Sequence, residues 1–212
     1  MEGIDSIVDE ITVLGKDDKV FDKIELSFQE QAYERGKPHK YLMASLKLFN
    51  AIKGRVIVEI GCMRKEMLHG INEFNPECCN DGHSTVIWAS SGAQVYSVDI
   101  DRKAVSIAKR SCKKYRNCTV KKADGIGFLE KFRDKIDLLY LDAWDVLPGT
   151  EYAENHVLAY LKAKPKLNRP NIIVIDDTDI ASGGKGRLLL PVLAADGYRI
   201  LVRGRQTVAI AG

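Results

Sequence analysis

Acidic residues follow five strand-like segments of this 212-residue chain, and their type and position are those of groups that bind ligands. Each stands at or near the end of a short apolar run: Glu59, Asp99, Asp124, Asp142 and the pair Asp176 and Asp177. Parallel strands bring their carboxyl ends to one edge of a sheet, where open α/β sheets bind their ligands. We therefore expect the acids to share one site, because the opposite ends of the strands carry no such pattern.

Asp99 is the acid whose role its position indicates best. It ends the apolar run that starts at Val95. In nucleoside-binding α/β folds an acidic residue at such a position accepts hydrogen bonds from ribose hydroxyls. The other role open to it, capping the next helix, fits Asp101 better. The position of Asp99 thus predicts a ligand that contains a ribose.

The segments that must position these acids alternate between strand and helix after residue 54. Runs rich in Val, Ile, Leu or Tyr predict strands at 55–60, 94–99, 119–122, 136–142, 171–176 and 198–202. Helical patterns lie between them at 84–91, 102–115, 125–132, 152–161 and 185–195. This alternation predicts an α/β fold, a doubly wound and mostly parallel sheet with helices on both faces.

The two ends of the chain depart from the alternation. The runs 199–203 and 206–210 are joined by a turn at Gly204, which permits only a hairpin, so the seventh strand should run antiparallel. Near the other end, helical stretches at 21–35 and 40–52 are broken around Pro38. We expect a helical extension over 1–50 and a single ligand-binding domain over 51–212.

The glycines after the first strand have an unusual spacing. Gly61 follows that strand without a Gly-x-Gly-x-x-Gly fingerprint, and the next turn that leads into a helix contains Gly82. Asp99 lies 17 residues beyond Gly82 but 38 beyond Gly61, whereas a spacing of about 20 is usual. The loop is therefore predicted to carry an insertion at about 64–80.

Composition and charge argue against several classes of protein. The formal net charge is only +3, and no basic stripe marks a nucleic-acid surface. No apolar run is long enough to span a bilayer, and the N-terminus does not resemble a signal peptide, so we expect a cytoplasmic protein. The cysteines number five and fit reduced thiols better than disulfides. A zinc site is disfavoured, because there is no Cys-x-x-Cys pair.

The order of the motifs resembles that of class I S-adenosylmethionine-dependent methyltransferases, with a Rossmann-like fold, over residues 55–212. The resemblance is carried by Val-Glu-Ile-Gly at 58–61, Gly-His-Ser-Thr at 82–85, Tyr-Ser-Val-Asp-Ile-Asp at 96–101, Ala-Asp-Gly at 123–125, Leu-Tyr-Leu-Asp at 139–142 and Ile-Val-Ile-Asp-Asp at 173–177. Within this family, the chain is similar to small-molecule O-methyltransferases of the catechol and macrolide-sugar types.

The resemblance implies a cofactor, S-adenosylmethionine, and the residues that bind it. Asp99 matches the acid that binds the ribose, and Asp124 matches the residue near the adenine amino group. The remaining residues of the implied cofactor site are Glu59, Gly61, Cys62, Gly82, His83, Ser84, Ile100, Gly125 and Asp142.

The resemblance also implies a divalent cation, Mg²⁺, held by Asp142, Asp176 and Asp177. Carboxylates at adjacent strand ends are hard oxygen ligands that suit this ion, which would lower the pKa of an acceptor hydroxyl. Asp142 or Asp145 would then take up the proton, and His156 is a further candidate base. In the alternative without a metal, Asp142 contacts only the cofactor and the other two acids cap a loop.

The expected function is methyl transfer from S-adenosylmethionine to a hydroxyl group of a small molecule. Three alternatives stay open: a metal-independent methyltransferase acting on nitrogen or nucleic acid, a nicotinamide oxidoreductase, and a non-catalytic binding protein. The missing glycine fingerprint argues against the oxidoreductase, and the acids at the strand ends argue against a mere scaffold. A small-molecule acceptor is the expected partner, without membrane or nucleic acid, and a homodimer stays open. Trp144 either lines the substrate pocket or belongs to the core.

Overall fold

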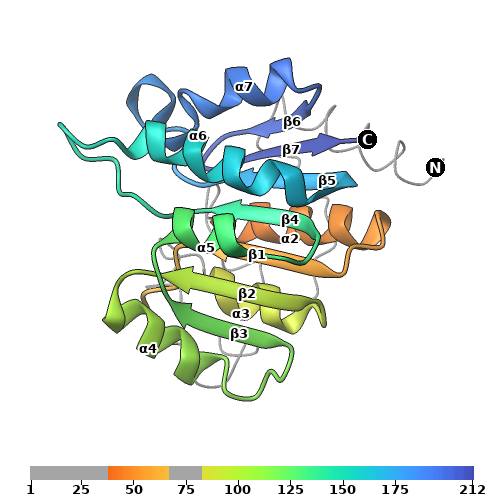
Figure 1. Cartoon of the computed structure of the whole chain (residues 1–212), viewed down its shortest axis with the longest axis vertical. Coiled ribbons are helices and arrows are strands. Elements are labelled where there is room, and N and C mark those ends of the chain that lie inside the picture. Colours follow the sequence, from red (N-terminus) through yellow and green to blue (C-terminus); the bar gives the residue numbers. More distant parts are fainter. Residues whose placement is uncertain (1–37, 67–82) are drawn as a thin grey trace.

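The structure is a computed structural model that describes residues 38–66 and 83–212. Seven strands form one sheet in the order β3-β2-β1-β4-β5-β7-β6 (Figure 1). The strands are β1 (Val56–Ile60), β2 (Gln94–Asp99), β3 (Cys118–Lys122), β4 (Ile136–Leu141), β5 (Leu167–Ile175), β6 (Arg199–Arg203) and β7 (Thr207–Ala211). The first five strands run parallel, and β7 is antiparallel to both of its neighbours. The predicted sheet, with its antiparallel C-terminal hairpin, is confirmed.

Helices cover both faces of the sheet. One face carries α2 (Pro38–Ala51), α3 (Ser84–Ser90) and α4 (Arg102–Ser111), and the other carries α5 (Gly125–Lys131), α6 (Tyr152–Ala163) and α7 (Leu189–Ala195). Figure 1 shows α5 and α6 in front of the sheet and α2 and α3 behind it. Short 3-10 turns, η5 (Lys164–Lys166) and η6 (Ala181–Gly186), precede β5 and α7. Among the described residues, no helix is long and apolar enough to cross a membrane.

The strands hold the helices in place because their side chains alternate between two apolar layers. Ile57 and Leu138 face α2 and α3, whereas Val58 and Leu139 face the opposite helices, and all four are fully buried. Burying one such side chain contributes about 1.5–3 kcal/mol. The central strand, β1, pairs with β2 on one side and β4 on the other. Strand order therefore reverses at the carboxyl end of β1, where a ligand crevice is expected.

Several predicted boundaries shift in the structure. The helix predicted at 185–195 begins at Leu189, since Lys185 and Gly186 belong to the 3-10 turn η6, in which residues 182–184 have backbone angles outside the right-handed helical region. The helix predicted at 102–115 ends at Ser111. In the N-terminal extension, the second predicted helix is present as α2. The first one, at 21–35, lies outside the described residues, as do Gly82 and most of the predicted insertion.

Candidate active site

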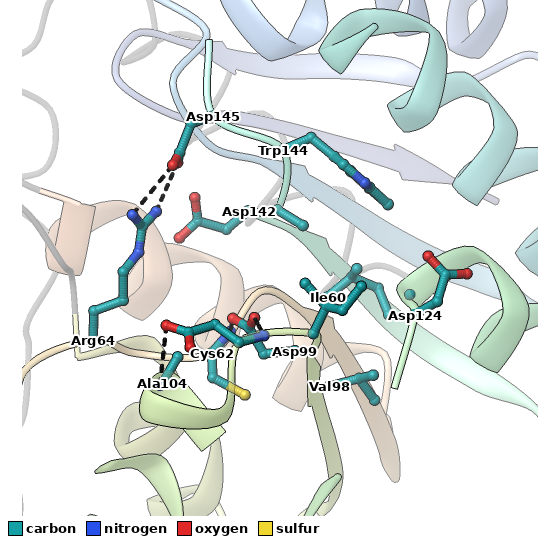
Figure 2. A pocket seen from close by; sticks show the side chains of 14 residues that line it. Ile60, Cys62, Arg64, Val98, Asp99, Ala104, Asp124, Asp142, Trp144 and Asp145 are labelled. Carbon is teal, nitrogen blue, oxygen red and sulfur yellow. Dashed lines mark hydrogen bonds and ion pairs between the residues drawn. The ribbon is translucent and has the colours of Figure 1, made fainter. Parts of the chain in front are cut away.

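A cavity of about 310 Å³ lies at the carboxyl ends of β1, β2 and β4 (Figure 2). Of the residues that the sequence predicts for cofactor binding or catalysis, the cavity lining includes Cys62, Asp99, Ile100, Asp124, Gly125, Asp142 and Asp145. The structure therefore brings acids from three different strand ends to one cavity. Trp144 also lines the cavity, which agrees with the first of its two predicted positions, the pocket wall or the core.

Two backbone amides fix the carboxylate of Asp99 at the edge of this cavity. The amide of Cys62 donates to Oδ2 at 2.8 Å, and the amide of Asp101 donates to Oδ1 at 2.8 Å. Each carboxylate oxygen can accept a second hydrogen bond, so both can still bind a ligand hydroxyl. Asp101 caps α4 through the amides of Lys103 and Ala104, which confirms its predicted role.

Glycine is required at the end of β1 because the loop after β4 lies close to it. Gly61 has a φ of +98°, and a Cβ there would lie 2.6 Å from the carbonyl carbon of Asp142. The amides of both residues donate to neighbouring strands, Gly61 to Val98 and Asp142 to Ile60, each at 2.8 Å. This close approach places Asp142 beside the end of β1, at the cavity.

Glu59 does not line the cavity. Its side chain is completely buried, and Oε2 accepts hydrogen bonds from the hydroxyls of Thr85, at 2.7 Å, and Ser97. Burial raises the pKa of Glu59 to about 7. His83 and Ser84, at the start of α3, are buried as well and lie outside the cavity lining. Glu59 thus ties β1, β2 and α3 together, and no contact with the cavity supports a cofactor role for these three residues.

The three acids predicted to hold a metal do come together. Oxygen atoms of Asp142, Asp176 and Asp177 lie within 4.8 Å of one another. The ammonium group of Lys185 is bonded to two of these acids, at 2.7 Å from Asp142 Oδ1 and 2.9 Å from Asp177 Oδ2. It also donates to the backbone carbonyl of Asp142 at 3.2 Å, and its side chain has no exposed surface.

The other carboxylate oxygens of Asp142, Asp176 and Asp177 are also contacted by hydrogen-bond donors. Arg205 lies 2.7 Å from Asp177 Oδ1 and 3.5 Å from Asp176 Oδ2. Gln206 donates to Asp176 Oδ1 at 2.7 Å, and the hydroxyl of Tyr140 donates to Asp142 Oδ2 at 3.2 Å. The residues present therefore do not fit a magnesium ion, which needs free oxygen ligands at 2.0–2.1 Å.

Charge and burial set the ionisation of this cluster. Burial by itself would raise the pKa of Asp142, but the adjacent charge of Lys185 outweighs it, and the pKa lies below its ordinary value. Burial and the charge of Asp142 raise the pKa of Asp176 well above its ordinary range. Burial would lower the pKa of Lys185, yet the surrounding carboxylates raise it, so Lys185 is a cation and not a base.

His156 lies behind Trp144 and not in the cavity lining. Its ring meets that of Trp144 edge-on, with centroids 5.2 Å apart, and its Nδ1 is bonded to the carbonyl of Tyr152 at 2.6 Å. Burial lowers the pKa of His156 to about 4. His156 thus packs against Trp144, which lines the cavity. Neither of these two contacts supports a role for His156 as a catalytic base.

Two residues that lie at this site, Lys185 and Arg64, are not predicted from the sequence. The helical pattern places Lys185 at the start of a helix, although the run Gly183-Gly184-Lys185-Gly186 is a signal for an irregular turn. Arg64 pairs with Asp145 at 2.8 Å and lines the cavity. Figure 2 shows this pair linking the loop after β1 to the loop after β4.

Comparison with known proteins identifies the fold. No protein-family profile matches the chain, and no curated protein sequence matches it. Among solved structures, the O-methyltransferase from Bacillus cereus in complex with SAH (S-adenosylhomocysteine) has a TM-score of 0.56 and 15% identity, covering 98% of this chain and 91% of that one.

Two further solved structures of methyltransferases are similar to this chain over nearly its whole length. The O-methyltransferase TomG from Streptomyces achromogenes, in complex with SAM (S-adenosylmethionine), has a TM-score of 0.57 at 12% identity, covering 95% of this chain and 89% of that one. The magnesium protoporphyrin IX methyltransferase (ChlM) from Synechocystis, with bound SAH, has a TM-score of 0.56 at 16% identity and covers 99% of both chains. The chain thus has the fold of class I S-adenosylmethionine-dependent methyltransferases.

Proposed function

We propose that this chain transfers a methyl group from S-adenosylmethionine to a hydroxyl group of a small molecule. The observation that carries the proposal is the cavity at the switch point of a methyltransferase fold, with Asp99 fixed at its edge. Its volume of about 310 Å³ lies within the range of small-ligand sites, which starts at about 300 Å³. Similar structures that hold SAH or SAM support the choice of cofactor.

The lining residues suit the parts of this cofactor. Asp99 would accept the two ribose hydroxyls, and Asp124 and Gly125 would lie along the adenine. Ile100 would offer an apolar surface to the base, since this residue lines the cavity and is 69% exposed. A Cβ on Gly125 would overlap the side chain of Ile60, so the glycine keeps this part of the cavity lining tightly packed.

The acceptor would lie toward Asp142 and Asp145. Methyl transfer to oxygen forms an O–C bond as the C–S bond of the sulfonium breaks, and the hydroxyl proton must go to a base. Asp142 is ionised at neutral pH because its pKa is low, and Asp145 offers an exposed carboxylate held by Arg64. These two carboxylates are the bases we propose. Because the cluster beside Asp142 does not fit magnesium, the proposal contains no metal.

A small acceptor agrees better with the charges than a nucleic acid does. Among the described residues, the cavity lining carries the acids Asp99, Asp101, Asp124, Asp142 and Asp145, against a single cation, Arg64. Such a surface repels phosphates, whereas nucleic-acid sites attract them with Lys and Arg. We propose a neutral or cationic small molecule that presents a hydroxyl group.

Calorimetric titration of the protein with S-adenosylhomocysteine tests the cofactor. We expect saturable binding with one site per chain. The transfer is then tested with methyl-labelled S-adenosylmethionine and a panel of catechols, sugars and other small alcohols. A folded protein that binds neither S-adenosylhomocysteine nor S-adenosylmethionine would contradict the proposal. Label found only on nitrogen or on RNA would contradict the proposed acceptor, a hydroxyl group of a small molecule, and leave the cofactor assignment standing.

A further inference from the structure

We propose that Lys185 is the built-in cation of the carboxylate cluster formed by Asp142, Asp176 and Asp177, in the place where a divalent ion would otherwise bind. Lys185 thereby acts as a positioning residue, which holds the carboxylate of Asp142 at the cavity without a metal. This inference concerns the cluster itself. Only its consequence for turnover rests on the proposed methyl transfer.

The ammonium group of Lys185 is surrounded by oxygen atoms of the cluster. An ammonium has three N–H donors, and Lys185 has three oxygen acceptors: Asp142 Oδ1 at 2.7 Å, Asp177 Oδ2 at 2.9 Å and the carbonyl oxygen of Asp142 at 3.2 Å. All three donors are satisfied without water, in a side chain that has no exposed surface. Lys185 is thus bound as an ion would be, by two carboxylates and a carbonyl.

A second positive charge, that of Arg205, lies at the same cluster. The two acids that contact Lys185, Asp142 and Asp177, face two cations, since Arg205 also binds Asp177 and, more distantly, Asp176 from the side of the β6–β7 turn. A divalent ion would need the oxygens that Lys185 and Arg205 already contact, and it would lie close to both positive charges. A buried charge is tolerated only when it is paired. The pairing here is made by Lys185 and Arg205, so these acids offer a divalent ion no oxygen without a donor.

The chain has a local structure that delivers this lysine. Residues 182–184 have positive φ angles, and the turn they form brings the amide of Lys185 within 3.2 Å of the carbonyl oxygen of Asp177. A Cβ on Gly184 would overlap that same oxygen. The glycine-rich turn therefore allows the backbone to fold tightly onto Asp177, which points the lysine into the cluster.

Manganese binding tests the inference directly, with a readout that needs no turnover. The wild-type protein is titrated with Mn²⁺, and free Mn²⁺ is followed by electron paramagnetic resonance. We expect no binding at micromolar concentrations, and we expect S-adenosylhomocysteine affinity to be the same with Mg²⁺ as with EDTA. Micromolar Mn²⁺ binding by the wild type that Asp177→Asn abolishes would overturn the inference.

Removing the ammonium gives the reciprocal test. Lys185→Ala leaves three carboxylates around a vacated position, and we expect this variant to gain Mn²⁺ binding by at least tenfold and to be stabilised by the ion. Lys162→Ala, which removes a lysine from the surface pair with Glu130, is the matched control and should bind no better than the wild type. If Lys185→Ala folds and gains no Mn²⁺ affinity, the ammonium does not take the place of an ion. If it does not fold, the wild-type titration decides.

Turnover separates this inference from the proposed function. With an acceptor in hand, the methylation rate should be unchanged by EDTA, within twofold. A rate that EDTA abolishes and Mg²⁺ restores would overturn the role of Lys185 but would confirm methyl transfer. Failure to bind S-adenosylhomocysteine would remove the proposed function, while the Mn²⁺ titrations would still decide the nature of the cluster.

Discussion

At the scale of single residues, Asp99 is the residue on which cofactor binding depends most. Its two oxygens accept two backbone amides and can still accept two hydroxyls. Hydrogen bonds to a charged group contribute about 1.5–3 kcal/mol each. We expect Asp99→Ala to weaken S-adenosylhomocysteine binding by about 100-fold, or about 2.7 kcal/mol, as measured by calorimetry.

The control for this variant is another aspartate that makes a hydrogen bond outside the cavity. Asp134 accepts one from the hydroxyl of Tyr96 and is exposed. We expect Asp134→Ala to bind S-adenosylhomocysteine as the wild type does. Equal affinities for wild type, Asp99→Ala and Asp134→Ala would refute the assignment of Asp99 to the ribose.

His156 gives a prediction for the dependence of stability on pH. Its pKa is about 4 in the folded protein, against 6.5 as the ordinary value, because burial disfavours the imidazolium. The unfolded chain therefore binds a proton that the folded protein does not, and stability falls as the pH falls from about 6.5 toward 4. His156→Gln removes this contribution. We expect the stability advantage of wild type over the variant to shrink by about 2 kcal/mol between pH 7 and pH 5.

Urea unfolding of both proteins at the two pH values measures this difference. Other groups that titrate in this range, such as His83 and Glu59, are common to both proteins and cancel in the comparison. A difference that stays constant from pH 7 to pH 5 would mean that His156 is protonated at its ordinary pKa. It would then be accessible to solvent, and a role as a base would regain support.

At the scale of elements, the turn before α7 depends on Gly184. This residue has a φ of +47°, and a Cβ would overlap the carbonyl oxygen of Asp177. We expect Gly184→Ala to lower the free energy of unfolding by more than about 2 kcal/mol, since even a left-handed alanine costs roughly 1–2 kcal/mol and the ψ of Gly184, −137°, lies outside that region. Gly149 is the matched control, because its φ is +78° but no atom of the described residues beyond its chain neighbours lies within 4 Å of a Cβ there. Equal losses for the two variants, measured by urea unfolding, would show that the turn can relax away from Asp177.

The positions of the acids at the strand ends could be predicted from the sequence only in part. The acids at the ends of β2 and β4 could be predicted, because a parallel sheet brings the carboxyl ends of its strands to one edge. The motif resemblance assigns Glu59 to the cofactor site, whereas strand side chains alternate between the faces of a sheet. Its neighbours Val58 and Ile60 pack toward α5 and α6, so Glu59 points the other way, toward α3. Its position could have been deduced from that alternation.

Lys185 could not be placed in the same way. Its position depends on the close contact between Gly184 and Asp177, which is a tertiary feature that no local pattern encodes. The pattern of residues 185–195 is helical, and the structure begins the helix only at Leu189. Three carboxylates without their cations predict a metal, whereas in the structure Lys185 pairs with Asp142 and Asp177 and Arg205 lies beside Asp176.

At the scale of the whole molecule, the fold by itself leaves the cofactor class open, since dinucleotides and S-adenosylmethionine both bind at such a switch point. Thermal unfolding in the presence of each ligand distinguishes a dinucleotide site from an S-adenosylmethionine site. A ligand at 100 times its Kd stabilises the folded state by about 2.7 kcal/mol, and each kcal/mol raises the Tm of a chain of this length by about 2–4 °C. We expect saturating S-adenosylhomocysteine to raise the Tm by about 5–11 °C. NAD⁺ should have no effect, because the loop after Gly61 lacks the glycine fingerprint that receives a pyrophosphate. Stabilisation by NAD⁺ alone would identify an oxidoreductase, and stabilisation by neither ligand would mean that the cavity beside Asp99 serves another function.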